Sequence, residues 1–169
     1  MGAASDVRKS FNLFFNGKGH AGKVEDFTPP KLALVTEDFR GGGMDAAVEL
    51  TMGLEKLECS FTLKSYDKAI LSAFGLVEGA QVPLTAREAL ESYDGTVTPV
   101  VHGMRGKIKE IDQGTAKPGE APPLKVSMAL DYYKLQHGGT TVHEIDVPNM
   151  VRVVNGVDAM APIRKALGL

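Results

Sequence analysis

Four segments of the chain contain residue types that bind cofactors or metals, or carry out catalysis, in other proteins. The first, residues 17–22 (GKGHAG), matches the G-x-G-x-x-G pattern of dinucleotide sites and follows a predicted strand. Such a site also needs a helix whose N-terminus faces the pyrophosphate. Only residues 23–28 separate this loop from Pro29 and Pro30, which leaves no room for that helix. The pattern therefore indicates a glycine-rich hairpin turn, and we expect no bound cofactor.

The second segment, residues 143–146 (HEID), offers metal-ligating side chains in one short run. Alternate residues of a strand point to opposite faces, so Glu144 and Asp146 share a face while His143 points away from them. The other three histidines of the chain are scattered among other predicted elements. We interpret the run as a solvated strand and expect no metal, with a metal site as the weaker alternative.

The third candidate is Cys59, the single cysteine of the chain. It alternates with polar residues in step with Leu57, Phe61 and Leu63, which predicts a small buried side chain rather than a nucleophile. One cysteine allows no intrachain disulfide, and no serine lies in a nucleophile-elbow sequence. No residue is nominated as catalytic, and we do not expect an enzyme.

The fourth segment, Gly41-Gly42-Gly43, resembles a phosphate-binding loop only in its glycines. Met44 and Asp45 stand where such a loop has Gly-Lys-Ser/Thr, and a carboxylate there would repel phosphate. Three glycines give the backbone access to positive φ or to close approach by another chain. We therefore expect a loop that is either mobile or used as a contact arm.

A stripe of positive charge is also predicted, because Arg105, Lys107 and Lys109 are spaced by two residues. On a strand all three side chains share one face, and Met104 and Ile108 lie on the other. The stripe is either an ordinary solvated face or a surface for an acidic partner.

Composition limits the class of protein. The chain has 169 residues, 43% apolar and 24% charged, with a net charge of -2. This length normally forms one domain, and we expect a single domain over residues 1–169. No apolar run approaches the ~18 residues that a membrane span needs, so no membrane anchor is expected. The mixed charges argue against a general nucleic-acid binder.

The hydrophobic pattern predicts a mainly β fold with one central short helix and a short C-terminal helix. The apolar residues mostly alternate with a period of two. The expected strands are residues 11–15, 31–39, 48–52, 57–63, 96–111, 124–135, 141–147 and 150–154. The helices are expected at residues 66–76, capped by Ser65 and ended by Gly75, and at residues 158–167. A hairpin turn is expected at residues 137–140 (HGGT).

Residues 30–45 (PKLALVTEDFRGGGMD) resemble a segment near the N-terminus of major tail tube proteins. These proteins form the inner tube of contractile-tailed bacteriophages of the myovirus type, and of R-type pyocins. The resemblance continues in the same order over nearly the whole chain. It includes residues 52–55 (MGLE), 74–76 (FGL), 104–112 (MRGKIKEID), 132–135 (YYKL), 144–146 (EID), 154–158 (VNGVD) and 167–169 (LGL). The loops at residues 17–22 and 117–123 look less typical of the family.

The resemblance implies a β-sandwich or barrel-like tail tube fold with a flanking helix. It implies hexameric rings that stack into a hollow tube, in a virion tail assembled in the bacterial host cytoplasm. The implied partners are other copies of the chain, the tail sheath protein, the tape measure protein, and the baseplate and tail terminator proteins. Double-stranded DNA would pass through the lumen without sequence-specific binding. The alternatives are the tube of an R-type pyocin or related contractile injection system, which carries no DNA, and a small β-barrel ligand-binding module.

Three sets of residues are expected to have roles on the basis of this resemblance. A glycine-rich contact arm at residues 40–52 would make contacts between subunits or rings through Arg40, Gly41, Gly42, Gly43, Met44 and Asp45. Glu144 and Asp146 would face the lumen, with Glu55 and Glu58 as weaker candidates, because a DNA channel should not attract phosphates strongly. Arg105, Lys107 and Lys109 would contact the sheath or a neighbouring subunit.

Overall fold

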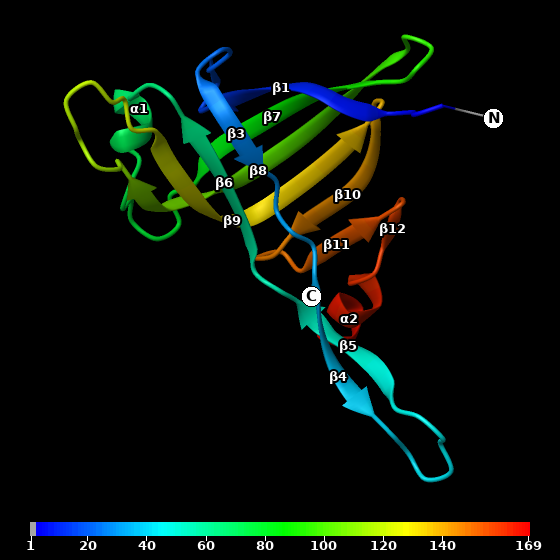
Figure 1. The fold of residues 1–169 in the computed structure, drawn as a ribbon. Helices are drawn as coiled ribbons and strands as arrows, with labels where there is room; N and C mark the ends of the chain where they lie inside the picture. Colours follow the sequence, from blue (N-terminus) through cyan, green and yellow to red (C-terminus); the bar gives the residue numbers. More distant parts are fainter. Residues whose placement is uncertain (1–2) are drawn as a thin grey trace.

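The computed structural model describes residues 3–169, which form twelve strands and two short helices (Figure 1). In chain order these are β1 (Val7–Phe15), β2 (Lys18–Gly19), β3 (Val24–Thr28), β4 (Leu34–Phe39), β5 (Val48–Leu54), β6 (Leu57–Leu63), α1 (Lys68–Leu71), β7 (Val82–Glu91), β8 (Val97–Asp112), β9 (Leu124–His137), β10 (Thr140–Asp146), β11 (Val151–Val154), β12 (Val157–Asp158) and α2 (Ala161–Ala166). The prediction of a mainly β fold with a central and a C-terminal short helix is confirmed.

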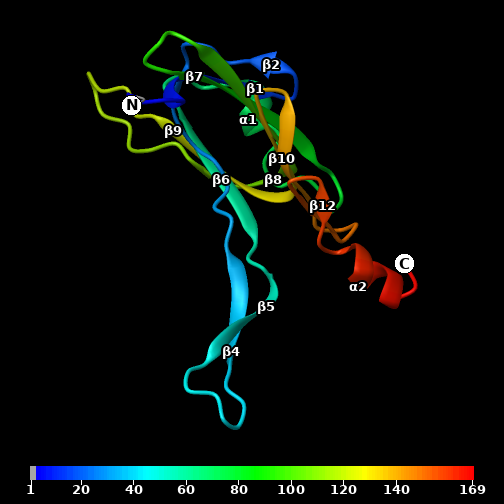
Figure 2. The same ribbon diagram turned by 90° about the vertical axis from the view of Figure 1, so that its right-hand side faces the viewer.

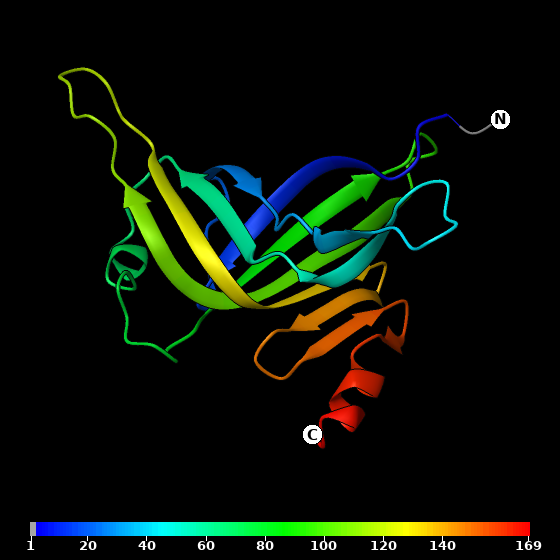
Figure 3. The ribbon, with the colours of Figure 1, turned by 90° about the horizontal axis from the view of Figure 1, so that it is seen from below.

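Ten of these strands form one antiparallel sheet, in which eight follow the order β12-β11-β10-β9-β8-β7-β1-β2. The long strand β9 divides the sheet, because its first half pairs with β6 and its second half pairs with β10. Strand β3 then pairs with β6. Strands β8 and β9 curve strongly, so that β3 and β6 lie over β1 and β7 in a barrel-like arrangement (Figures 1 and 3).

The hydrophobic core fills the space inside this curved sheet. Alternate residues of each long strand point inward, as in β7, where Val82, Leu84 and Ala86 are buried. They pack with Phe61 of β6 and Met128 of β9 in one cluster. Cys59 belongs to the same cluster, and burial raises its pKa to about 12, so the thiol is a core side chain as predicted.

Strand β7 lies in a region where the sequence pattern indicated no element. Its sequence, VPLTAREALE, contains proline, alanine and glutamate, which have low β-propensity. The pairing with β1 on one side and β8 on the other overrides that preference. Strand β3 was also missing from the expected elements.

The two helices are shorter than expected. Helix α1 spans four residues instead of residues 66–76, and its cap is the Asp67 carboxylate, which accepts from the Ala69 amide at 2.8 Å, rather than Ser65. Gly75, with a φ of +72°, ends the following turn. Helix α2 begins at Ala161 rather than at residue 158, because Asp158 belongs to β12 and Pro162 occupies the first turn.

The hairpin turn predicted at residues 137–140 is confirmed, whereas the one expected at residues 17–22 lies earlier, because Lys18 and Gly19 form β2. Phe15 pairs with Lys18 across Asn16 and Gly17, whose φ angles of +48° and +82° suit a two-residue turn. His137 pairs with Thr140 in the same way across Gly138 and Gly139. Among the described residues, no helix has the length and apolar character needed to cross a bilayer.

Candidate functional site

Strands β4 and β5 form a separate two-stranded hairpin that projects from the body of the molecule (Figures 1 and 2). We call residues 34–54 the arm. A two-stranded hairpin without further packing is marginally stable in water. The arm is therefore an element that requires a partner.

The register of the arm gives it one apolar and one polar face. Phe39 lies opposite Val48, and Glu37 lies opposite Leu50, on the first face. Two pairs, Asp38 with Glu49 and Thr36 with Thr51, form the second face. Phe39 is 52% exposed and Leu50 is 47% exposed, although both are large apolar side chains. Such a continuous exposed apolar row marks an interaction surface.

The six residues expected to make contacts lie together at the tip of the arm. The Met44 amide donates to the Gly41 carbonyl at 3.2 Å, and the Arg40 side chain donates to the Met44 carbonyl at 3.1 Å. Gly43 adopts a φ of +83°, which favours glycine. The tip is a compact turn held by its own hydrogen bonds.

The residues expected to face the lumen lie on the outer face of the sheet, away from the core. The Tyr132 hydroxyl donates to Glu144 at 3.0 Å, and Tyr132 pairs in register with Asp146. Burial and the hydrogen bond to Glu144 raise the pKa of Tyr132. The Arg105 guanidinium lies over the Tyr132 ring, 4.2 Å from the ring centre, in a cation–π contact.

The positive stripe therefore shares this outer face with Glu144 and Asp146. Arg105, Lys107 and Lys109 are exposed and alternate with buried residues of β8, as the spacing predicts. Lys107 pairs with Glu78 at 2.7 Å, and Lys109 pairs with Glu58. Each of the three basic side chains thus has a partner within the chain: an aromatic ring for Arg105 and a carboxylate for each lysine.

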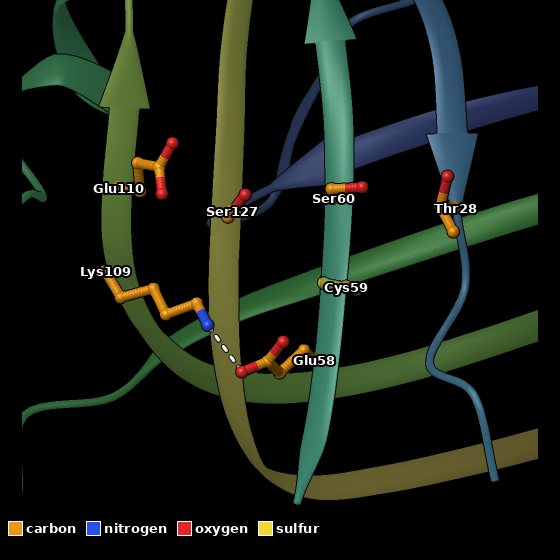
Figure 4. Close-up of a pocket in the computed structure, with 7 residues that line it drawn as sticks. All are labelled: Thr28, Glu58, Cys59, Ser60, Lys109, Glu110 and Ser127. Carbon is orange, nitrogen blue, oxygen red and sulfur yellow. Dashed lines mark hydrogen bonds and ion pairs between the residues drawn. The ribbon is translucent and has the colours of Figure 1, made fainter.

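Figure 4 shows a polar row on the same face, next to the ion pair of Lys109 and Glu58. Thr28, Ser60, Ser127 and Glu110 stand in register on the neighbouring strands β3, β6, β9 and β8. Lys109 and Lys56 together hold the pKa of Glu58 below its usual value. The sequence did not indicate this row, because it is assembled from four strands distant in the chain.

Metal binding finds no support in this arrangement. Across residues 3–169, no three His, Cys, Asp or Glu side chains are grouped so that they could hold a metal ion. His143 lies on the opposite face of β10 from Glu144, as predicted.

Comparison with known proteins places the chain. Residues 7–168 match the family model described as phage tail tube protein FII. The chain belongs to this family. It is 33% identical over 165 residues to the tail tube protein of Escherichia phage P2, covering 95% of this chain and 96% of the relative. It is also 32% identical over 162 residues to the major tail tube protein of Serratia phage KSP20, covering 94% of each chain.

A solved structure has a similar fold. The match is to a chain of the sheath-tube complex of an extracellular contractile injection system in its extended state, with a TM-score of 0.54. It covers 75% of this chain and 87% of the other at 9% identity, so the likeness concerns the fold alone. The predictions of a tail tube protein, of a structural component of a contractile tail and of a protein without enzymatic function are confirmed.

A buried polar network lies inside this tail tube protein, and the sequence analysis missed it. Glu88 lies 3.2 Å from Arg8 and 3.3 Å from His102, which contacts the Tyr133 hydroxyl at 2.8 Å. Burial raises the pKa of Tyr133. The network joins strands β1, β7, β8 and β9, with Glu88, His102 and Tyr133 buried and the Arg8 side chain half exposed. The available signal was that Glu88 is spaced by two residues from Ala86 and Leu90, in phase with the inward-facing apolar residues of β7.

The C-terminal helix of the tail tube protein is a second exposed apolar element. Asp158 accepts from Arg164 at 2.6 Å, and Arg164 also donates to the Met150 carbonyl. These bonds hold α2 against β11 and β12. Ile163 and Leu167, four residues apart on one face, remain 47% and 60% exposed.

Proposed function

We propose that the chain is the protomer of a phage tail tube in which six copies form a ring and the rings stack into a hollow tube that conducts DNA. The observation that carries this proposal is the arm, an ordered hairpin whose apolar face has no partner in the described part of its own chain. Such an element has a physical reason to exist only if another molecule covers it.

Ring formation would pair the backbone N–H and C=O groups that are exposed at the edges of the sheet. One edge ends at β11 and β12, where Val154 and Val157 are 45% and 69% exposed. The other edge includes β1, which short β2 covers only at Phe14 and Phe15. Pairing one edge with the opposite edge of a neighbour joins the sheets into a closed ring and leaves no lateral edge.

We propose that the outer face of the sheet lines the channel, including Glu144 and Asp146. Arg105 contacts the same tyrosine as Glu144, so both belong to one surface. This geometry favours the channel for Arg105, and it weakens the expectation that Arg105, Lys107 and Lys109 contact the sheath. Cations paired with carboxylates attract passing phosphates less than free cations do.

The remaining partners are inferred from membership of the tail tube family. The tube would enclose the tape measure protein during assembly in the host cytoplasm, carry the sheath on its outside, and meet the baseplate and the terminator at its ends. Both curated relatives come from phages, which favours a DNA-conducting tail over a pyocin-like device.

Light scattering across a concentration series, with and without purified phage baseplates as seeds, tests this proposal. We expect the scattering mass to rise with concentration, and seeds to lower the concentration at which tubes grow. A chain that stays monomeric at every concentration, seeded and unseeded, would contradict it.

A further inference from the structure

The arm carries negative charge in addition to its apolar face. Residues 34–54 contain four acidic side chains, Glu37, Asp38, Asp45 and Glu49, and one basic side chain, Arg40. Arg40 is bonded to the Met44 carbonyl in the tip. The surface that receives the arm should therefore be both apolar and basic.

One region of the body has both properties, and we call it the basic platform. It consists of the exposed apolar side chains Tyr66, Phe74, Leu76 and Val77 and the lysines Lys18, Lys23, Lys64 and Lys68. Val77 is 79% exposed and Phe74 is 53% exposed. A hollow of about 520 Å³ lies among Lys18, Lys23, Tyr66 and Lys68.

The acids close to the platform are already engaged. Asp67 is buried, caps α1 and lies 3.2 Å from Lys18. Burial opposes its ionisation, but the bonds from Ala69 and Lys18 hold its pKa below the usual value. Glu78 pairs with Lys107. Lys23, Lys64 and Lys68 form no ion pair within residues 3–169.

The arm and the platform lie at opposite ends of the molecule (Figures 1 and 3). The arm therefore does not reach the platform of its own chain. A contact between two different surfaces can repeat from copy to copy, and it stays open when successive copies are displaced along an axis instead of closing around it. That is the geometry required of the contact that stacks one ring on the next.

We propose that the basic platform of one copy binds the apolar face of the arm of a second copy. This inference rests on the proposed tube function and specifies one of its contacts. Phe39, Val48 and Leu50 lie against the exposed side chains of the platform, and Glu37, which shares their face of the arm, lies against its lysines.

Charge exchange tests the contact. The arm variant E37K and the platform variant K64E/K68E each alter exposed residues, so both are expected to fold, as circular dichroism will verify. Each variant alone should lower the pelletable tube fraction by ~10-fold, and an equimolar mixture or a chain with all three changes should restore it. Single variants that assemble like the wild type would overturn the inference and leave the tube function standing.

Cysteine pairing gives an independent readout that does not need tubes. Cys59 is 3% exposed and will not compete with introduced thiols. E37C protein mixed with K68C protein should form a disulfide-linked dimer under mild oxidation, whereas E37C mixed with L167C, on the exposed face of α2, should not. No dimer with K68C, or preferential capture by L167C, would overturn the inference. Failure of the wild type to form tubes would count against the proposed function separately.

Discussion

At Gly106 the strands β8 and β9 approach each other so closely that no side chain fits between them. A Cβ atom at this position would overlap the Ala129 carbonyl and lie 2.8 Å from the Leu130 Cα. Both obstacles are backbone atoms, so relief requires one strand to move. The glycine therefore fixes the bulge in the longest strand pair of the sheet.

Gly106→Ala should lower the free energy of unfolding by about 1–3 kcal/mol, the usual cost of overpacking. Urea denaturation followed by circular dichroism measures the change. Gly103→Ala is the matched control on the same strand, because its Cβ would meet nothing closer than 3.9 Å. Equal stability of the two variants would contradict the close approach of the strands.

The ion pair of Asp158 and Arg164 should make the attachment of α2 to β12 depend on pH. The bond from Arg164 holds the pKa of Asp158 below its ordinary value of 3.8. A depressed carboxylate pKa adds stability that is present above the ordinary value and is lost as the pH falls through the folded value. The amide signals of α2 in NMR spectra should therefore shift on acidification below about pH 4. Asp158→Asn should show the acid-type shifts at neutral pH, and a wild-type spectrum from this variant would refute the role of the pair.

At the scale of elements, the sequence predicts best where the alternation is uninterrupted. The strand at residues 57–63 and the exposed positions of Arg105 and Lys109 are direct consequences of a period of two. Strand β7 could not be predicted in this way. It is extended because it pairs with β1 and β8, and its own residues do not favour β structure. The length of α1 depends on tertiary contacts in the same way, since Phe74 bridges to Ile108.

The candidate surfaces were predictable only in part. The glycine run located the tip of the arm, but its amphipathic register depends on a bulge between Val35 and Thr36 that no local pattern indicates. Likewise, the shared face of Arg105 and Glu144 depends on the strand order β8-β9-β10. The spacing of residues within one strand predicts which of them share a face of that strand. The order of the strands in the sheet decides which residues of different strands share a surface.

Deletion of Gly41 to Asp45 should leave a folded chain that no longer assembles, because the tip of the arm makes no contribution to the core. Thermal unfolding and sedimentation of the same samples measure the two properties. Gly42→Ala is the matched control, since nothing lies within 4 Å of its Cβ position and its φ is not positive. Full-length tubes from the deletion variant would contradict the role of the arm.

At the scale of the whole molecule, the channel face predicts how charge affects the passage of DNA. Glu144→Lys with Asp146→Lys should leave rings intact but slow DNA ejection from reconstituted particles, with a delay that shrinks as salt rises, because free lysines attract phosphates. Glu120→Lys, on the exposed loop between β8 and β9, changes the net charge by the same amount as Glu144→Lys alone and is the control for that single variant. Ejection at the wild-type rate from the double variant would place the face outside the channel.

The most direct measurement of the central claim is electron cryomicroscopy of the assembled wild-type chain. We predict stacked rings with sixfold end views, the curved sheet around a hollow centre, and each arm in contact with a copy in the next ring. Isolated closed particles without stacking, or arms folded back on their own subunit, would contradict it.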